Sequence, residues 1–480
     1  MSKTFRSILP VATALLVILT AFGNSTAQEI EATLTVYTQR SEVRVEGRIL
    51  NEDALSSSQP LVFLSDYAGI RLPHERIRNV KQDGRGWSYD VDLTPMTGPA
   101  AMAHVSWLTT SGGILMLADL LPKPRIKNKR RTAKLTLIIH DGSGATLPWT
   151  WSSVGTTERW QTEAYIIADT EKAVFFLKFV PVFSRKNADI HTNVRVRIAG
   201  DFTFDPLEVS ELADEIYRRY EALFRGPLRP FIVALTKLPD GAPLGVWEAD
   251  TRGTSVTIVS SDMPFKSQSL QRLHEQLRHE MFHLWIPEGV NLTGNYDWFY
   301  EGFALYQSLK LGVAVNRLRF EDYLDSLTKA YAIDRRLSGK ASLINASKTR
   351  WSGDDNSVVY ARGMLVAFLC DLAILEASKG KRSTDDIVRE VYQKHGDTTT
   401  PQDGNAAIMA IMAQRPELVP IIERYVTGAE KLDWAAFLNA TGLEATGGIL
   451  KVVAKPTGRQ KKLLDKLGYN NWRKLSSTRK

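Results

Sequence analysis

The hydrophobic pattern of this 480-residue chain changes near residue 207, and this change limits the possible folds more than any other feature. From residue 29 to about 200, apolar and polar residues alternate in short runs such as "AKLTLIIHD" and "NVRVRIAG", which is typical of half-buried strands. Later stretches such as "LEVSELADEIYRRYEALFRG" have the periodicity of amphipathic helices. We therefore predict an α+β multidomain protein, with a β-sandwich-like domain at 28–200, a mixed domain at 201–330 and an all-helical domain at 331–445.

The first 27 residues are expected to lie outside these domains. Lys3 and Arg6 precede the apolar run 8–22, and small residues follow up to Ala27. This order is typical of a secretory signal peptide, so we predict an exported protein in the periplasm or outside the cell, with no stable membrane insertion after cleavage. The alternative is an uncleaved membrane anchor, which 15 apolar residues disfavour because a span needs about 20.

Charge is distributed unevenly along the chain. The formal net charge is +8, but residues from Lys451 to the end carry ten Lys or Arg and one acid, Asp465. Because the first 27 residues hold two more cations and no acid, residues 28–450 are net acidic by three charges. The basicity belongs to a C-terminal tail, residues 446–480, which we expect to be solvated or to contact an anionic surface weakly. The acidic body argues against nucleic-acid binding.

Two groups of potentially reactive residues are interpreted as structural. Cys370 lies in the apolar helical run "MLVAFLCDLAI", so we expect a buried thiol and no intramolecular disulfide. The histidines His74, His104, His140 and His191 are scattered through the β-rich part without the spacing of metal ligands.

The stretch "RHEMFHLW" places two histidines four positions apart on a helix predicted at 268–285. Positions i and i+4 project from the same helix face, so His279 and His283 can direct their ring nitrogens at one ion. Glu280 lies beside the first histidine without being a ligand, which suits it to take a proton from a metal-bound water. This H-E-x-x-H pattern predicts a catalytic site with one Zn²⁺ per chain.

A third protein ligand is predicted on the next helix. The stretch "DWFYEGFALY" supplies Glu301 among aromatic and apolar neighbours. A carboxylate in such surroundings needs a partner, and a metal is the natural one. A catalytic zinc has three protein ligands and one open position, so we predict that His279, His283 and Glu301 hold the ion.

The combination "HEMFH…WFYEGFALY" resembles the gluzincin metallopeptidases, whose zinc ligands are the two histidines and the later glutamate. Residues 284–300 separate the second histidine from the glutamate, one residue fewer than in the membrane alanyl aminopeptidase family. The stretches "YARGMLVAFLCDLAI" (360–374) and "ERYVTGAEKLDWAAFLNATGLE" (423–444) are more similar to the glycyl aminopeptidase family. This resemblance, over about 207–444, implies a thermolysin-like catalytic domain at 201–330 and a helical domain after it.

The same resemblance implies roles for four more residues. Tyr360 stands where the family has the tyrosine that donates a hydrogen bond to the developing oxyanion. In the loop "GVWEAD", 245–250, Glu248 keeps the acidic position that binds the free amino group of a substrate. Gly245 and Trp247 are expected to contact the substrate beside it, and Trp247 would narrow the first subsite toward glycine or alanine.

Three features depart from the glycyl aminopeptidase pattern. Ala249 replaces the polar residue that follows the acidic position, and the interval before Glu301 is shorter than in that family. Only 38 residues follow Gly442, too few for the family's usual PDZ domain. These departures leave open whether the first residue of a substrate is recognised.

We therefore expect an exported zinc metallopeptidase that hydrolyses peptides, most simply an aminopeptidase that prefers an N-terminal glycine or alanine. Glu280 would take a proton from the zinc-bound water and pass it to the leaving amine. A gluzincin endopeptidase is the alternative. An inactive zinc-containing exported binding protein is a third possibility, against which Glu280 argues because a purely structural zinc site has no use for it.

Overall fold

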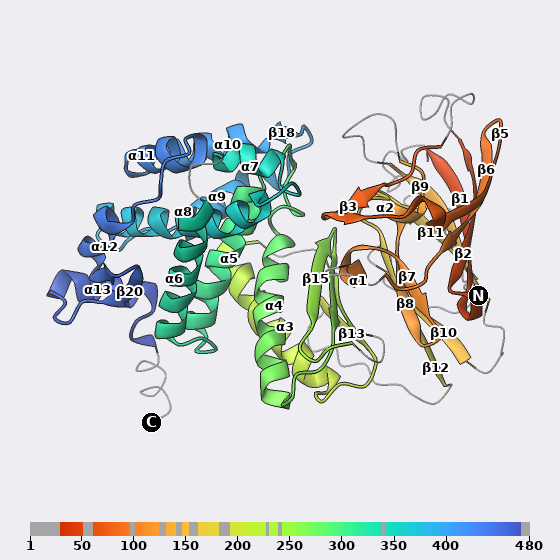
Figure 1. The fold of residues 1–480 in the computed structure, drawn as a ribbon, viewed down its shortest axis with the longest axis horizontal. Helices are drawn as coiled ribbons and strands as arrows, with labels where there is room; N and C mark the ends of the chain where they lie inside the picture. The colour runs from red at the N-terminus through yellow and green to blue at the C-terminus, as the bar shows by residue number, and fades with distance from the viewer. Residues whose placement is uncertain are drawn as a thin grey trace, which may run out of the picture.

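The computed structural model has the predicted α+β multidomain architecture. Figure 1 shows a β-rich N-terminal half on one side, a helical C-terminal half on the other and a smaller sheet between them. The predicted signal peptide, the end of the tail from 472 and His191 lie outside the described residues. The structure describes residues 29–50, 61–96, 101–123, 131–140, 146–152, 162–181, 193–226, 230–238, 242–337 and 341–471.

Two sheets form the N-terminal β domain. The larger has the strand order β11-β9-β1-β2-β6-β5 and the smaller has the order β10-β12-β8-β7. Every second residue of β1 is buried, as the period-two pattern predicts. The inner faces of both sheets share one apolar core that includes Leu34, Tyr89 and Phe175, so this half is a β-sandwich-like domain. The strands are β1 (Ile30–Tyr37), β2 (Glu42–Ile49), β5 (Ile77–Asp83), β6 (Gly86–Asp92), β7 (Trp107–Thr109), β8 (Gly112–Met116), β9 (Ala133–His140), β10 (Thr146–Ser152), β11 (Thr162–Ile167) and β12 (Val174–Pro181).

Short elements of the N-terminal β domain extend toward the middle of the molecule. The hairpin β3–β4 and helix α1 reach toward strand β15 of the middle sheet (Figure 1). They are the elements of this domain that come near the candidate site. Their bounds are β3 (Asp66–Tyr67), β4 (Ile70–Arg71) and α1 (Ala101–His104), and the other short elements are η1 (Thr38–Arg40), η3 (His74–Arg76) and α2 (Leu117–Leu120).

The middle sheet is covered on both faces. Its order is β13-β14-β16-β15, with β15 antiparallel at one edge. Helices α3 and α4 pack on one face, with α5 against α4, and Trp107 and Phe176 of the N-terminal β domain pack against Ile232 on the other face. The bounds are β13 (Val194–Ala199), α3 (Pro206–Phe224), β14 (Phe231–Lys237), β15 (Trp247–Arg252), β16 (Ser255–Ser260), α4 (Lys266–His283) and α5 (Asp297–Ala314).

Strand β13 lies before the domain boundary that the sequence predicts at residue 200, but it belongs to the middle sheet. It pairs in parallel with β14, and its buried Val194 and Val196 belong to the core beneath α3. The run "NVRVRIAG" therefore lies in the middle sheet. Its alternation correctly predicted a strand, but alternation does not say which sheet a strand joins.

The C-terminal half packs around the apolar helix α8. This helix is long and apolar enough to cross a membrane, but 94% of its apolar window is buried inside the protein. It is therefore the core of the helical half, and it carries buried Cys370. The bounds are β17 (Leu292–Thr293), α6 (Phe320–Leu337), α7 (Leu343–Lys348), α8 (Asp355–Ala377), α9 (Asp385–His395), β18 (Gln402–Asp403), α10 (Gly404–Ala413), η4 (Pro416–Leu418), α11 (Val419–Ile421), η5 (Ile422–Thr427), α12 (Ala435–Thr441), β19 (Leu443–Thr446), β20 (Ile449–Val452) and α13 (Gly458–Leu467).

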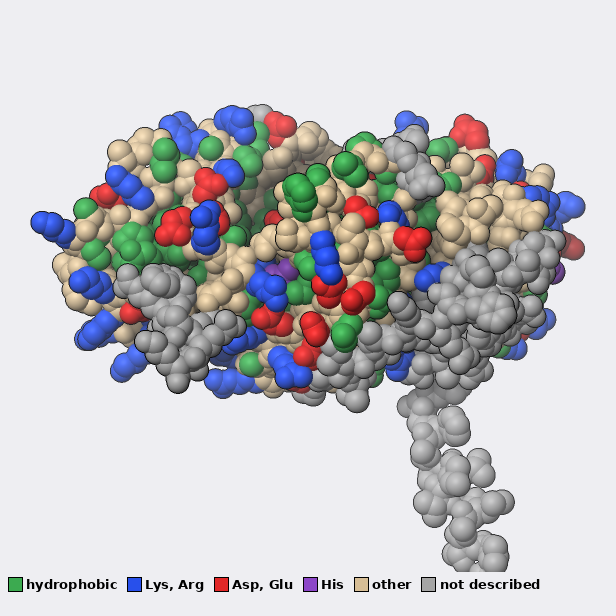
Figure 2. Space-filling model, turned by 90° about the horizontal axis from the view of Figure 1, so that it is seen from below, with side chains coloured by type: hydrophobic (Ala, Val, Ile, Leu, Met, Phe, Trp, Pro, Cys, Tyr) green, Lys and Arg blue, Asp and Glu red, His purple; other side chains and the backbone are tan. Residues whose placement is uncertain are grey.

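Part of the region predicted as a basic tail is folded. Strand β20 pairs with β19, and α13 begins with a capping box at Thr457. The leucines Leu463, Leu464 and Leu467 of α13 are buried in the same core as α8. The charge count identified the basic residues, but the three leucines determine how this segment packs. The face of the molecule in Figure 2 shows Lys and Arg side chains interspersed with Asp and Glu.

Candidate metal centre

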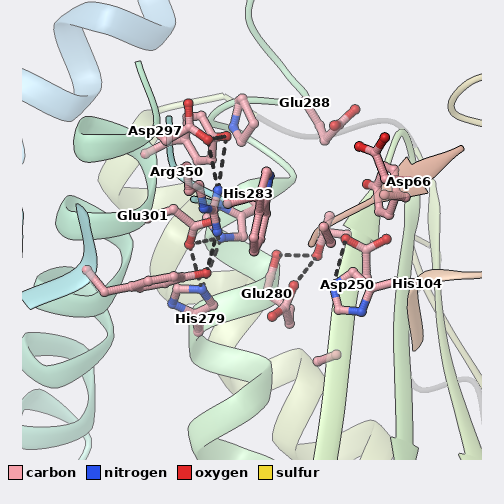
Figure 3. Close-up of a pocket in the computed structure, with 18 residues that line it drawn as sticks. Asp66, His104, Asp250, His279, Glu280, His283, Glu288, Asp297, Glu301 and Arg350 are labelled. Carbon is pink, nitrogen blue, oxygen red and sulfur yellow. Dashed lines mark hydrogen bonds and ion pairs between the residues drawn. The ribbon is translucent and has the colours of Figure 1, made fainter. Parts of the chain in front are cut away.

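Helices α4 and α5 bring two histidines and one carboxylate together. His279 and His283 lie one turn apart on α4, with their Nε2 atoms 3.1 Å apart. Glu301 of α5 places Oε2 3.2 Å from Nε2 of His279 and 3.4 Å from Nε2 of His283. Figure 3 shows the three side chains converging on one point. The structure thus brings together the three residues that the sequence predicts as ligands.

The donor atoms fit a zinc ion in spacing and in chemistry. Ligand atoms in a tetrahedral zinc site lie about 3.3 Å from one another, because each bond is about 2.0–2.1 Å long. Among the described residues, Glu301 Oε2 is buried and has no hydrogen-bond partner, as expected of an atom that faces a cation. Among the described residues, one cluster of His, Cys, Asp or Glu side chains is close enough together to hold a metal ion. It consists of His279, His283 and Glu301.

The outer atoms of two predicted ligands, His283 and Glu301, are held by the protein. His283 Nδ1 lies 3.1 Å from the carbonyl oxygen of Ile286, a contact that leaves Nε2 free to bind a metal when Nδ1 carries the proton.

Burial alone would lower the pKa of His283, but the Glu301 carboxylate raises that pKa to about 9. Burial alone would raise the pKa of Glu301, but Arg350 and His283 hold it well below its usual range. Metal binding would therefore release a proton from this ion-paired cluster.

Glu280 lies beside the cluster and is bound from the opposite side. Its Oε2 accepts a hydrogen bond of 2.8 Å from Thr251 Oγ1 of strand β15, which also donates to the backbone oxygen of Glu280. The carboxylate is 6% exposed and lines the cavity. The hydrogen bond from Thr251 therefore holds the Glu280 carboxylate apart from Glu301. A general base beside a metal-bound water needs such a separate position.

Arg350 joins one predicted metal ligand, Glu301, to the predicted catalytic tyrosine. Its Nη2 donates to Glu301 Oε1 at 2.8 Å and to Tyr360 Oη at 2.7 Å, and its Nη1 donates to Asp297 Oδ1 at 2.9 Å. Burial raises the pKa of Tyr360 well above its ordinary value, which keeps its hydroxyl protonated. Sequence analysis missed Arg350, because its position in "ASKTRWSG" before α8 carries no motif.

Two glycines allow α5 and α8 to cross closely enough for these contacts. A Cβ atom on Gly302 would lie 2.3 Å from the carbonyl carbon of Gly363, and one on Gly363 would lie 2.6 Å from the carbonyl oxygen of Trp298. Gly302 follows Glu301, and Gly363 is three residues after Tyr360. The close crossing therefore sets the distance between a metal ligand and the tyrosine.

The cluster opens into a cavity of about 420 Å³, which we call the metal cavity. It has two walls, which face each other in Figure 3. Residues of α4, α5, the loop after α4 and the segment from Arg350 to Tyr360 form the helical wall. The N-terminal β domain and strand β15 form the β wall. The helical wall consists of His279, Glu280, His283, Pro287, Glu288, Asp297, Tyr300, Glu301, Arg350, Trp351 and Tyr360, and the β wall consists of Asp66, Tyr67, Ala68, His104, Ala249, Asp250 and Thr251.

His104, interpreted from the sequence as structural, lines the metal cavity. Its Nε2 lies 3.9 Å from Asp250 Oδ1, and its backbone oxygen accepts a hydrogen bond from Arg252. Arg252 also pairs with Asp250 and stacks over Tyr67. The spacing of His104 in the sequence gave no signal, because its neighbours in the cavity, such as Tyr67 and Asp250, come from separate segments of the chain.

Glu248 lies on strand β15, outside the lining of the metal cavity formed by the described residues. Its Oε2 accepts hydrogen bonds from the backbone N–H groups of Met102 and Ala103, at 2.8 and 3.2 Å, so it faces α1. Within the described chain, β15 contributes Ala249, Asp250 and Thr251 to the lining of the metal cavity, and Glu248 is absent from it. The backbone at the start of α1 presents free N–H groups that attract a carboxylate.

Trp247 and Gly245 also lie outside the lining formed by the described residues. Trp247 packs at the margin of the central apolar core. Gly245 has a φ of +77°, and a Cβ there would lie 3.0 Å from the sulfur of Met263. The glycine is therefore explained by the turn before β15 and its packing.

Comparison with known proteins shows a similar fold but no match to a family model or a curated protein. No protein-family model matches the sequence, and no curated protein matches it. The structure is similar to the crystal structure of an aminopeptidase N family protein from Idiomarina loihiensis, with a TM-score of 0.66 and 15% sequence identity. The match covers 87% of this chain and 79% of that protein. The two proteins share a fold.

Proposed function

We propose that this protein is a zinc-dependent peptidase of the gluzincin type, similar to the glycyl aminopeptidases, and that His279, His283 and Glu301 hold the ion. The observation that carries this proposal is the convergence of three ligand atoms within 3.1–3.4 Å beside a separate carboxylate, Glu280. The shared fold with an aminopeptidase N family protein supports it. A purely structural zinc site would need no additional carboxylate that does not bind the ion.

When bound, zinc would supply a Lewis acid for the scissile carbonyl and a water of lowered pKa. Glu280, held by Thr251, would accept a proton from the attacking water and deliver it to the leaving amine. Arg350 donates to the Tyr360 oxygen, so the proton of that hydroxyl remains available for a carbonyl oxygen in the cavity. Tyr360 and Glu280 are therefore the proposed catalytic residues.

The preferred substrate is a peptide. Strand β15 ends its sheet and contributes three residues to the metal cavity, so its outer edge can pair with an extended backbone. Aminopeptidase activity toward an N-terminal glycine or alanine is the first candidate, in keeping with the shared fold. Endopeptidase activity is the second, because Glu248 bonds to α1 and so does not supply the expected partner for a free amino group. Export, supported by the sequence of residues 1–27, is part of the proposal.

Paired peptides test this proposal. Peptides that begin with Gly or Ala, each with a free or an acetylated N-terminus, are incubated with the purified protein and stoichiometric zinc. Release of the first residue from the free peptides alone supports the aminopeptidase. Equal cleavage of both members, or internal cleavage, supports the endopeptidase. Cleavage that persists in Glu280→Gln at the wild-type rate would contradict the metallopeptidase mechanism.

A further inference from the structure

A second cavity lies directly beside the metal cavity, and its lining has a different chemical character. It measures about 320 Å³, within the range of small-molecule and side-chain sites. Thr251, Tyr67 and Glu288 line both cavities. Since Thr251 Oγ1 is 2.8 Å from Glu280 Oε2, the second cavity begins one side chain away from the proposed general base.

The floor of the second cavity is apolar. Leu117, Ala118 and Leu121 come from α2 and the residue after it, and Leu64 comes from the segment before β3. Leu117 and Leu121 are buried in the core of the N-terminal β domain, so their positions are fixed by packing. The metal cavity differs, because ionisable side chains make up most of its lining.

Two ion pairs lie at the rim of the second cavity, whose lining also includes Lys123 and Glu171. Lys172 Nζ lies 2.7 Å from Glu288 Oε2, and Glu288 also accepts from the backbone of Gly253. Arg252 pairs with Asp250 at 2.7 Å and stacks on Tyr67. A charged ligand group would have to compete with these pairs, whereas an apolar group would displace water from the partly exposed side chains of Leu64 and Ala118.

From these observations we propose that the second cavity is a subsite for one large apolar side chain of the peptide substrate, such as leucine. This inference rests on the proposed peptidase function and names its substrate preference. It differs from the preference for glycine and alanine that the resemblance to the glycyl aminopeptidase family implies. Because Thr251 lines both cavities, the subsite lies within reach of a residue next to the scissile bond.

Binding and turnover of a leucine scan test the subsite. The probes are tetra-alanine and its four variants with a single leucine. Binding to Glu280→Gln is measured by calorimetry, and hydrolysis by the wild-type protein is measured in parallel. We expect leucine at one position to strengthen binding and raise kcat/KM about tenfold or more, in keeping with burial of several methyl and methylene groups.

Two filling variants show whether the second cavity causes this preference. Ala118→Trp and Leu64→Trp place an indole in the cavity from different segments, and Ala222→Trp, on the exposed surface of α3, is the matched control. Both filling variants should abolish the leucine preference while tetra-alanine binds within about twofold of its original affinity. The control should retain the preference.

The outcomes separate the subsite from the proposed function. If both filling variants weaken the binding of leucine and alanine peptides equally, the proposed subsite is wrong. It is also wrong if the variants leave the leucine preference unchanged. Absence of a leucine preference in the unmodified cavity also overturns it. Leucine-selective binding that the filling variants abolish, without any hydrolysis, supports the subsite and contradicts the peptidase.

Discussion

The helical wall and the β wall of the metal cavity are built differently. On the helical wall, Arg350 alone joins a metal ligand, Tyr360 and Asp297 through hydrogen bonds of 2.7–2.9 Å. On the β wall, His104 and Asp250 stand 3.9 Å apart, and Asp66 is exposed. The difference indicates that the helical wall is preorganised for chemistry, whereas the β wall shapes what can bind.

The largest expected effect comes from Glu280 on the helical wall. Glu280→Gln keeps the shape of the side chain but removes the base, so kcat should fall by about a thousandfold with little change in bound zinc. Kinetics and metal analysis of the same preparation measure both quantities. Glu275→Gln, an exposed acid on the same helix, is the control and should retain activity. Loss of zinc together with activity in Glu280→Gln would assign it a ligand role instead.

Arg350→Met should have the next largest effect, on stability as well as on activity. Removing this buried cation leaves Glu301 and Asp297 without their partner, at a cost of about 3–5 kcal/mol in the free energy of unfolding. Chemical denaturation of the metal-free protein measures this change. Arg272→Met breaks an exposed pair with Glu275 and should alter stability little. Equal stabilities of the two variants would show that the helical wall does not depend on Arg350.

Gly302→Ala tests whether the close crossing of α5 and α8 holds the helical wall together. The added Cβ would meet the backbone of Gly363 at 2.3 Å, so we expect a loss of about 1–3 kcal/mol. Thermal unfolding measures it. Gly458→Ala is the matched control, because a Cβ there has no neighbour within 4 Å. A Gly302→Ala protein as stable and as active as the control would show that the helices have room to separate.

The smallest effect is expected from Glu248→Gln, on the strand that carries part of the β wall. The amide oxygen can still accept from the start of α1, so folding should be preserved. Because the side chain faces away from the metal cavity, the ratio of rates on free and acetylated peptides should stay the same within about twofold. A selective loss of activity on free peptides would restore Glu248 as the partner of the amino group.

The sequence predicted the helical wall because its signals are local. The two histidines and Glu280 lie within five consecutive positions, where helix geometry alone decides which side chains share a face. Glu301 was found from its aromatic neighbours, and Tyr360 from a resemblance to a family helix. Arg350 was missed, because its role depends on the crossing of α5 with α8, which spacing within one segment does not reveal.

The β wall could not be predicted in the same way. His104, Asp66 and Thr251 come together through the packing of the N-terminal β domain against the middle sheet. Glu248 and Ala249 show how sensitive such a prediction is, because neighbouring residues of a strand point to opposite faces. The predicted position in the loop was one residue away from a side chain that does line the cavity.

The central claim is that His279, His283 and Glu301 together hold one zinc ion. Native mass spectrometry of the protein after removal and restoration of zinc counts the ions bound to each chain. The account predicts one zinc in the wild-type protein and none in His283→Ala or Glu301→Gln under the same conditions. A wild-type protein without zinc, or variants that retain one ion per chain, would contradict it.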